Sequence, residues 1–149
     1  MNIPKIKTKK LPGPKSARLI KQDEHYTSPS YTRAYPLVAK QGRGFAIEDY
    51  DGNIFLDITA GIAVCATGHC HPEIVKVIKD QASKLIHMSG TDFYYKPQSE
   101  LAKKLAEIAP GKSSKKVFYT NSGAESVEAA FKLARYATER QRIISFSGA

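Results

Sequence analysis

The residues best suited to chemistry in this 149-residue sequence are three consecutive small ones, Ser122, Gly123 and Ala124. They separate a β-branched and aromatic run at residues 116–120 from apolar residues at helical spacing over residues 127–134. The first amides of a helix have no partner within it and carry the positive end of the helix dipole. A turn of this kind therefore predicts a site for an anion such as a phosphate, which Gly123 would let approach the backbone.

The same turn has a simpler interpretation as a helix cap. Ser122 and Glu125 form the Ser-x-x-Glu pattern of a capping box, in which the two side chains satisfy free amides at a helix start. Such a cap needs no bound ligand. On these residues alone, an empty cap and a phosphate site both remain open.

A metal site is a second possibility, because thiolate and imidazole are the ligands that zinc prefers. Cys65, His69, Cys70 and His71 lie close together in the sequence. Three of them are consecutive, however, whereas zinc sites usually draw paired ligands from separate segments. The sequence therefore predicts no metal site. The two cysteines are too few for a disulfide framework and are expected to be reduced thiols.

The elements that would position these residues form an α/β arrangement. Residues 45–49 and 54–58 flank Asp51-Gly52 and predict a β-hairpin. Residues 72–86 and 97–109 have helical periodicity, and a proline stands at or near the start of each.

The end of the sequence predicts a parallel strand–helix–strand unit, with residues 116–120 and the terminal residues 143–149 as its strands. Parallel sheets are usually larger than two strands and covered on both faces, so more chain is expected. We expect three regions: a basic, solvated N-terminal arm at 1–34, a hairpin and helix segment at 35–88, and the incomplete beginning of a larger domain at 89–149.

Charge is distributed unevenly along the chain. The formal net charge is +9, but seven of the 23 basic residues and none of the 14 acidic ones lie in the first 21 positions. The remaining 16 basic residues nearly balance the 14 acidic ones. No nucleic-acid-binding motif accompanies the basic arm, so a nucleic-acid partner is not expected. Neither an apolar signal core nor a run of about 18 apolar residues is present, so we expect a cytoplasmic protein without membrane contact.

Several motifs in order resemble one enzyme family. The segment NSGAESVEAAFKLAR (121–135) resembles the cofactor-phosphate turn of class III aminotransferases, the 4-aminobutyrate, ornithine and acetylornithine group of fold type I pyridoxal-phosphate enzymes. YPLVAKQGRGFAIEDYDGNIFLDITAGIAVCATGHCHP (35–72) resembles the N-terminal signature of that group, and IISFSGA (143–149) resembles a later strand. The likeness covers about residues 11–149. It implies the start of a fold type I large domain, preceded by an N-terminal segment.

The resemblance also assigns roles to particular residues. It implies that Ser122, Gly123 and Ala124 hold the phosphate of pyridoxal 5'-phosphate, and that Ile62 and Tyr94 border the substrate. An aliphatic residue at the position of Ile62 is more similar to the 4-aminobutyrate type than to the ornithine type. Ile62 could otherwise be a core residue, and Tyr94 a packing residue with a solvated hydroxyl. The family's catalytic lysine lies beyond the matching region, so no catalytic residue is assigned in this chain.

The resemblance implies a parent enzyme that moves an amino group from an ω-amino acid such as 4-aminobutyrate to a 2-oxo acid. The complete enzyme would be a homodimer, and this chain alone is predicted to be inactive because the lysine is missing. Two alternatives stay open. One is a fragment of a class III racemase, epimerase or aminomutase, and the other is a stand-alone phosphate-binding or interaction module.

Overall fold

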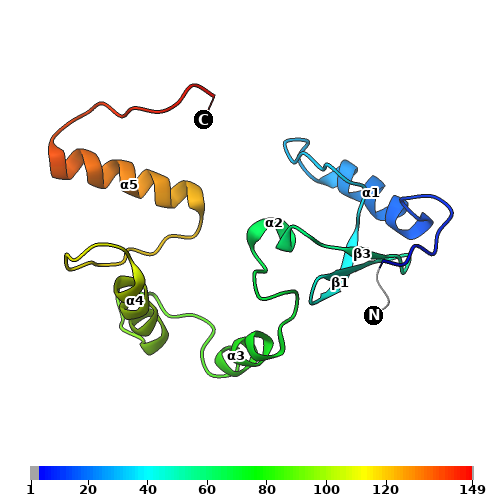
Figure 1. The fold of residues 1–149 in the computed structure, drawn as a ribbon, viewed down its shortest axis with the longest axis horizontal. Coiled ribbons are helices and arrows are strands. Elements are labelled where there is room, and N and C mark those ends of the chain that lie inside the picture. Colours follow the sequence, from blue (N-terminus) through cyan, green and yellow to red (C-terminus); the bar gives the residue numbers. More distant parts are fainter. Residues whose placement is uncertain (1–3, 149) are drawn as a thin grey trace. The chain divides into compact units, whose positions relative to one another are not determined.

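The structure is a computed structural model that describes residues 4–148. The chain divides into two compact units, Met1–Ile86 and His87–Ala149, and each is described by itself. The first unit contains α1 (Pro14–Tyr26), β1 (Ala39–Arg43), β2 (Ala46–Asp49), β3 (Ile54–Leu56), α2 (Ala60–Ala63) and α3 (Pro72–Ala82) (Figure 1). The second unit contains α4 (Lys96–Ile108) and α5 (Gly123–Thr138).

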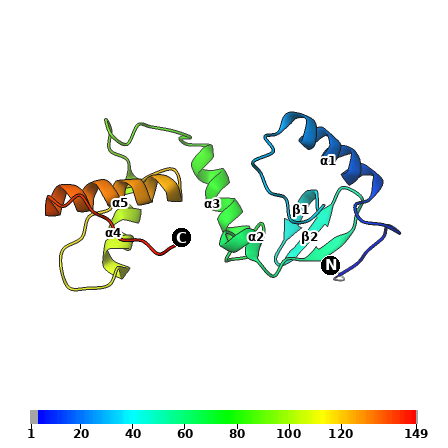
Figure 2. The same cartoon turned by 90° about the horizontal axis from the view of Figure 1, so that it is seen from above.

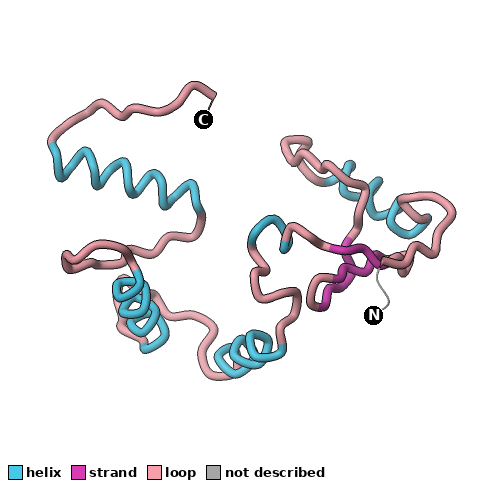
Figure 3. The backbone as a smooth tube through the Cα atoms, viewed as in Figure 1, coloured by secondary structure: helices cyan, strands magenta, loops and turns pink. Residues whose placement is uncertain are grey.

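The first unit contains a three-stranded antiparallel sheet in the order β1-β2-β3. Its strands are drawn in magenta in Figure 3. Ala46 lies opposite Arg43 on one side and Leu56 on the other. The hairpin predicted around Asp51-Gly52 is confirmed, because β2 and β3 pair across that turn. β1 was not predicted from the sequence. It carries a polar stretch, AKQGR, which has little of the β-branched and aromatic character that marks a strand.

A buried amide network joins the β2–β3 turn to the start of the chain. Asn53 is fully buried, and its Oδ1 accepts hydrogen bonds from the amides of Lys7 (2.7 Å) and Thr8 (3.1 Å) and from the Thr8 hydroxyl. Its amide and its Nδ2 donate to the two carboxylate oxygens of Asp49, which also accepts from the amide of Asp51. Because every polar atom of the Asn53 side chain is paired, its burial is compatible with a stable fold.

Helix α1 is capped by a residue distant in sequence. The carboxylate of Asp51 accepts hydrogen bonds from the first amides of α1, those of Lys15 and Ser16, both at 2.9 Å. The Asp51 side chain lies so close to the backbone of Gly13 that a Cβ on Gly13 would be 2.4 Å from Asp51 Cγ. The basic arm therefore contains a helix fixed to the hairpin turn, and α1 was not predicted from the sequence. Its start signal, Gly13-Pro14, lies in the segment that the sequence predicts to be a solvated arm.

The hairpin also holds the segment that follows α2. Gly44 and His69 exchange backbone hydrogen bonds of 2.9 and 2.7 Å, which form an isolated antiparallel bridge. A Cβ at Gly42 would lie 2.9 Å from the Cβ of His69, so a residue without a side chain is needed there. These contacts fix the backbone of His69 beside the end of β1.

Helices α3, α4 and α5 confirm three sequence predictions with small differences at their ends. α3 ends at Ala82 and not at residue 86, and α4 begins and ends one residue earlier than predicted. The second unit is a helix pair joined by the loop at residues 109–122 (Figure 2). The hydroxyl of Tyr119 in this loop donates to the carbonyl of Gln98 near the start of α4, at 2.9 Å.

The predicted parallel strands do not form in the part of the chain that the structure describes. Residues 116–120 and the described part of 143–149 are in no strand, and Ala149 lies outside the described residues. Their apolar side chains are largely exposed, as with Phe118 and Phe146. A strand exists only where a neighbouring strand accepts and donates its backbone hydrogen bonds. Residues 4–148 supply no such neighbour to these two segments. Within the same residues, no helix combines the length and the apolar character needed to cross a membrane.

Replacing Asn53 with alanine should loosen the first unit. The substitution leaves three donors of Lys7 and Thr8 without their acceptor, a loss of about 1–3 kcal/mol. Hydrogen exchange is the measurement, and the amides of both residues should exchange at least about fivefold faster. Lys40→Ala is the matched control, since it removes only an exposed ion pair with Glu48. Equal protection in the two variants would contradict the role of Asn53.

Candidate functional site

The start of α5 is a capped helix terminus. Ser122 is the N-cap, and its Oγ accepts a hydrogen bond from the amide of Glu125 at 3.2 Å. The carboxylate of Glu125 returns the contact by accepting from the amide of Asn121 at 2.6 Å, one residue before the cap. The capping box read from the sequence is therefore present, with its second bond shifted by one residue.

Two amides remain available at this terminus. Among residues 4–148, the amides of Gly123 and Ala124 have no hydrogen-bond acceptor, as expected for the first positions of a helix. Apart from the adjacent residues and the backbone of α5 itself, no atom of residues 4–148 lies within 4 Å of the place that a Cβ on Gly123 would occupy. The side chains of Thr120 and Ser126 lie at the same turn and both donate to the carbonyl of Ser122. The turn therefore offers free donors and open space to an anion, and these fit a phosphate group.

A hollow of about 970 Å³ lies beside the same helix. Phe118 and Thr120 from the preceding loop line it, together with Ala124, Ala130 and Leu133 from α5. Its volume is at the upper end of the range for small-molecule sites, and its walls are mostly apolar. The hollow could therefore accommodate the body of a ligand whose anionic end meets the helix terminus.

The first unit contains a strained turn. The residues of α2, Ala60–Ala63, all have positive φ, between 52° and 63°. Hydrogen bonds of 2.7 Å from the amide of Ala63 to Thr59 O and from that of Cys65 to Ala60 O close the turn. Each L-residue in a left-handed turn is unfavourable by about 1–2 kcal/mol, and a β-branched residue such as Ile62 is a clear outlier there. Strain of this kind is concentrated at functional sites.

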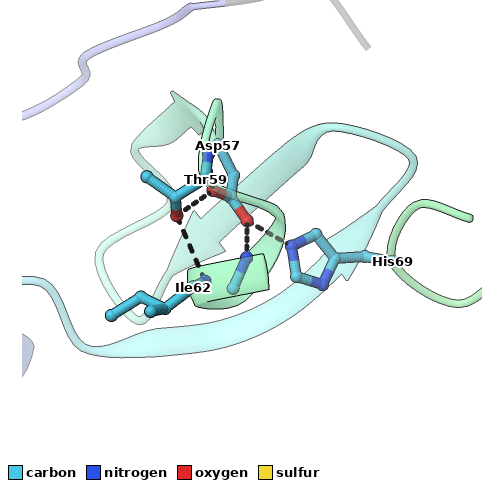
Figure 4. Close-up of polar contacts among 5 residues, drawn as sticks. Asp57, Thr59, Ile62 and His69 are labelled. Atoms are coloured by element: carbon cyan, nitrogen blue, oxygen red, sulfur yellow. Dashed lines mark hydrogen bonds and ion pairs between the residues drawn. The ribbon is translucent and has the colours of Figure 1, made fainter. Parts of the chain in front are cut away.

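A carboxylate and an imidazole hold this turn (Figure 4). Oδ1 of Asp57 accepts from the amide and the hydroxyl of Thr59, and Oδ2 accepts from the amide of Gly61, each at 2.8 Å. The Nε2 of His69 donates to Oδ2 at 2.6 Å. The bond from His69, and then those from Thr59, hold the pKa of the Asp57 carboxyl well below its usual range. Asp57 is therefore ionised at neutral pH.

The residues assigned to the substrate by resemblance are both exposed. Ile62 is 84% exposed on the left-handed turn of the first unit. Tyr94 is fully exposed in the second unit, in the loop before α4. Ser122, Gly123 and Ala124 are adjacent at the start of α5 in that second unit. Neither Ile62 nor Tyr94 is a buried packing residue within residues 4–148.

Asp57 and Thr59 are not predicted as site residues from the sequence, and His69 is a candidate there only as a metal ligand. Asp57-Ile58-Thr59 does carry a local signal, because an aspartate often accepts from the amide two residues later. No local signal connects Asp57 with His69, which is 12 residues away. Within the described residues, no group of three or more His, Cys, Asp and Glu side chains is placed to hold a metal ion.

Comparison with known proteins identifies the family. The model of the class-III aminotransferases matches residues 26–149. This chain belongs to the class-III aminotransferase family. The match includes the left-handed turn, the loop of Tyr94 and the start of α5.

Similar proteins carry several enzyme names. The chain is 46% identical over 125 residues to an acetylornithine aminotransferase of Methanopyrus kandleri. That alignment covers 84% of this chain and 31% of the other protein. It is 40% identical over 135 residues to an isoleucine 2-epimerase of Lentilactobacillus buchneri, and the alignment covers 90% of this chain and 30% of that protein. It is 40% identical over 124 residues to a probable 4-aminobutyrate aminotransferase of Bacillus subtilis, covering 83% and 28%. The chain thus spans about a third of the length of these relatives.

Solved structures confirm the fold class. The acetylornithine aminotransferase of Elizabethkingia anophelis superposes with a TM-score of 0.71 at 34% identity, covering 80% of this chain and 30% of that one. The taurine:2-oxoglutarate aminotransferase of Bifidobacterium kashiwanohense gives 0.75 at 32% identity, covering 84% and 28%, and was solved in complex with PLP and glutamate. The chain therefore has the α/β fold of part of a fold type I enzyme, and pyridoxal phosphate is the cofactor of its family.

Removing the imidazole should raise the pKa of Asp57. In the folded protein that pKa lies below its ordinary value of 3.8, so the ionised carboxylate stabilises the turn above about pH 4. This contribution is lost as the pH falls from there through the folded pKa. A ¹³C NMR titration of the carboxyl should show a higher pKa in His69→Ala. His87→Ala is the control, because His87 is exposed and does not contact Asp57. Equal pKa values in both variants would contradict the assignment.

Proposed function

We propose that this chain is the N-terminal part of a pyridoxal-phosphate-dependent aminotransferase that takes the amino group of an ω-amino acid, such as 4-aminobutyrate, and gives it to a 2-oxo acid. The observation that carries the proposal is the start of α5. Among residues 4–148 its amides at Gly123 and Ala124 have no acceptor, the space beside Gly123 is open, and the turn lies within the family match. These features fit the phosphate of the family's cofactor.

The roles of this chain's residues follow from their chemistry. The amides of Gly123 and Ala124 and the hydroxyl of Ser122 would hold the cofactor phosphate, with the dipole of α5 adding to the attraction. Bound pyridoxal phosphate supplies an electron sink and carries the amino group between substrates. Fixing the phosphate at a rigid helix end limits the freedom of the whole cofactor, which favours a productive orientation.

The amino-donor preference is inferred from Ile62. An exposed aliphatic residue next to the substrate would favour a short aliphatic donor such as 4-aminobutyrate over ornithine. The probable 4-aminobutyrate aminotransferase among the relatives is consistent with this choice, although acetylornithine aminotransferases are also similar. Tyr94 would border the same substrate from the loop before α4.

Other properties of the parent enzyme are part of the same proposal. The catalytic lysine would come from chain outside these 149 residues, so the chain alone would not transaminate. This is supported by the share of the relatives that it spans, about a third. We infer a cytoplasmic homodimer for the complete enzyme.

A second candidate function is amino-acid epimerisation or racemisation. The isoleucine 2-epimerase of Lentilactobacillus buchneri is nearly as similar to the chain as the aminotransferases are. The two activities differ in their need for a 2-oxo acid. An epimerase inverts one amino acid without an acceptor, whereas an aminotransferase completes its cycle only with one.

An acidic residue at position 123 should weaken cofactor binding without disturbing the helix. Acids are favourable in the first turn of a helix, so Gly123→Asp should leave α5 folded. Its carboxylate would repel the phosphate. Gly123→Asn has the same shape without the charge and is the matched control. In the complete enzyme, equilibrium dialysis should show pyridoxal phosphate bound at least about tenfold more weakly by the aspartate variant than by the asparagine variant. If the two variants bound pyridoxal phosphate equally well, the phosphate would not be held at this turn.

A larger residue on the left-handed turn should change the amino-donor preference. Ile62→Tyr places a phenol where the aliphatic donor would lie, and a misfit of this size lowers kcat/KM for 4-aminobutyrate by about tenfold or more. The value for ornithine should fall less. Steady-state kinetics with both donors is the measurement. Ile58→Tyr is the control, as Ile58 is equally exposed in the same unit. If both tyrosine variants lowered the two values alike, Ile62 would not border the donor.

A further inference from the structure

We propose that Asp57 is a positioning residue for the amino-donor side of the site. Its carboxylate, fixed by His69, holds the left-handed turn that presents Ile62 (Figure 4). The proposal rests on the proposed function in one respect, which is that Ile62 borders the amino donor. The roles of Asp57 and His69 are inferred from the contacts in the first unit.

The turn requires a holding group because its backbone is unfavourable. Four consecutive residues have positive φ, and three of them, Ala60, Ile62 and Ala63, are not glycine. Isolated L-residues leave this region readily for the right-handed one. Three backbone hydrogen bonds close the turn, from the amides of Ala63, Val64 and Cys65, but a right-handed turn would form bonds of the same kind. A contact from outside the turn must therefore select the left-handed form.

Asp57 supplies that contact. Its two oxygens together receive four hydrogen bonds, two from Thr59, one from the amide of Gly61 and one from His69. The Thr59 hydroxyl oxygen in turn accepts from the amide of Ile62 at 3.3 Å. The carboxylate thus orients the two amides inside the turn, one directly and one through Thr59. Its own orientation is fixed because both oxygens are engaged.

His69 connects this carboxylate to the sheet. The backbone of His69 is paired with Gly44 in both directions, and Gly42 leaves room for its side chain. Both the imidazole and the carboxylate are mostly buried, at 16% and 12% exposure. The turn is therefore held against the hairpin and does not depend on its own short backbone alone.

The side chain of Ile62 does not pack against the residues that hold the turn. It is 84% exposed, so its side chain is not placed by neighbours among residues 4–148. Its position is set by the backbone of the turn. Any change that lets the turn relax should move Ile62 away from the donor while leaving the start of α5 untouched.

The test is steady-state kinetics of the complete, cofactor-loaded enzyme carrying Asp57→Asn. The population of the left-handed turn should fall, and KM for 4-aminobutyrate should rise about 5- to 30-fold while kcat changes less than about twofold. The affinity for pyridoxal phosphate should not change. Thr59→Val, a milder substitution, should shift KM in the same direction.

A glycine rescue distinguishes this account from general destabilisation. Ala60→Gly removes the Cβ that makes positive φ unfavourable, so it should return KM in the Asp57→Asn background towards the wild-type value. Ala66→Gly is the matched control, because Ala66 lacks a positive φ, and it should not restore KM. The proposal is overturned if Asp57→Asn leaves KM unchanged, or if the two glycines act alike.

A failure of the proposed function would look different. If the wild-type enzyme does not use 4-aminobutyrate with any 2-oxo acid, the proposed donor is wrong, and the turn can still be tested. The ¹³C methyl resonance of Ile62 should shift in Asp57→Asn and return with Ala60→Gly. An unchanged resonance would overturn the role of Asp57 whatever the enzyme's substrate.

Discussion

Apolar burial is scarce in this chain, and the other features of the structure follow from that constraint. Ala46 is the one fully buried hydrophobic residue between residues 4 and 148. The apolar faces of α3, α4 and α5 are uncovered by the described residues, as Val77, Leu101 and Val127 show. Apolar faces that nothing covers cannot hold a segment in place. Local polar contacts therefore fix the backbone over short stretches of the chain.

Three polar clusters fix the backbone locally. Asp49 and Asn53 tie the beginning of the chain to the hairpin, and Asp57 and His69 hold the left-handed turn. The Ser122 cap begins α5. Each cluster fixes backbone direction over a few residues, which is what a binding site needs. A family whose active site is assembled from distant segments can keep each segment shaped locally in this way. The helix terminus is then suited to an anion, and the turn to presenting an aliphatic side chain.

The sequence predicted those elements that are determined by a few neighbouring residues. The Asp51-Gly52 turn, the prolines at the starts of α3 and α4, and the Ser122 cap are all encoded within a few residues. The failures have distant causes. α1 is capped by a carboxylate about 35 residues away, and the left-handed turn depends on His69 as well as on Asp57. The parallel strands expected at residues 116–120 and 143–149 need neighbours that the described chain does not supply. The capped start of α5 could be located from its residue types, but the carboxylate and imidazole that hold the Ile62 turn could not.

The proposed function depends on the start of α5 holding the cofactor phosphate. The most direct measurement is an experimental structure of the complete enzyme with pyridoxal phosphate bound. If the phosphate is held there, its oxygens should lie within about 2.7–3.2 Å of the amide nitrogens of Gly123 and Ala124. A phosphate held at another turn, with these two amides bonded to water or to protein, would contradict it.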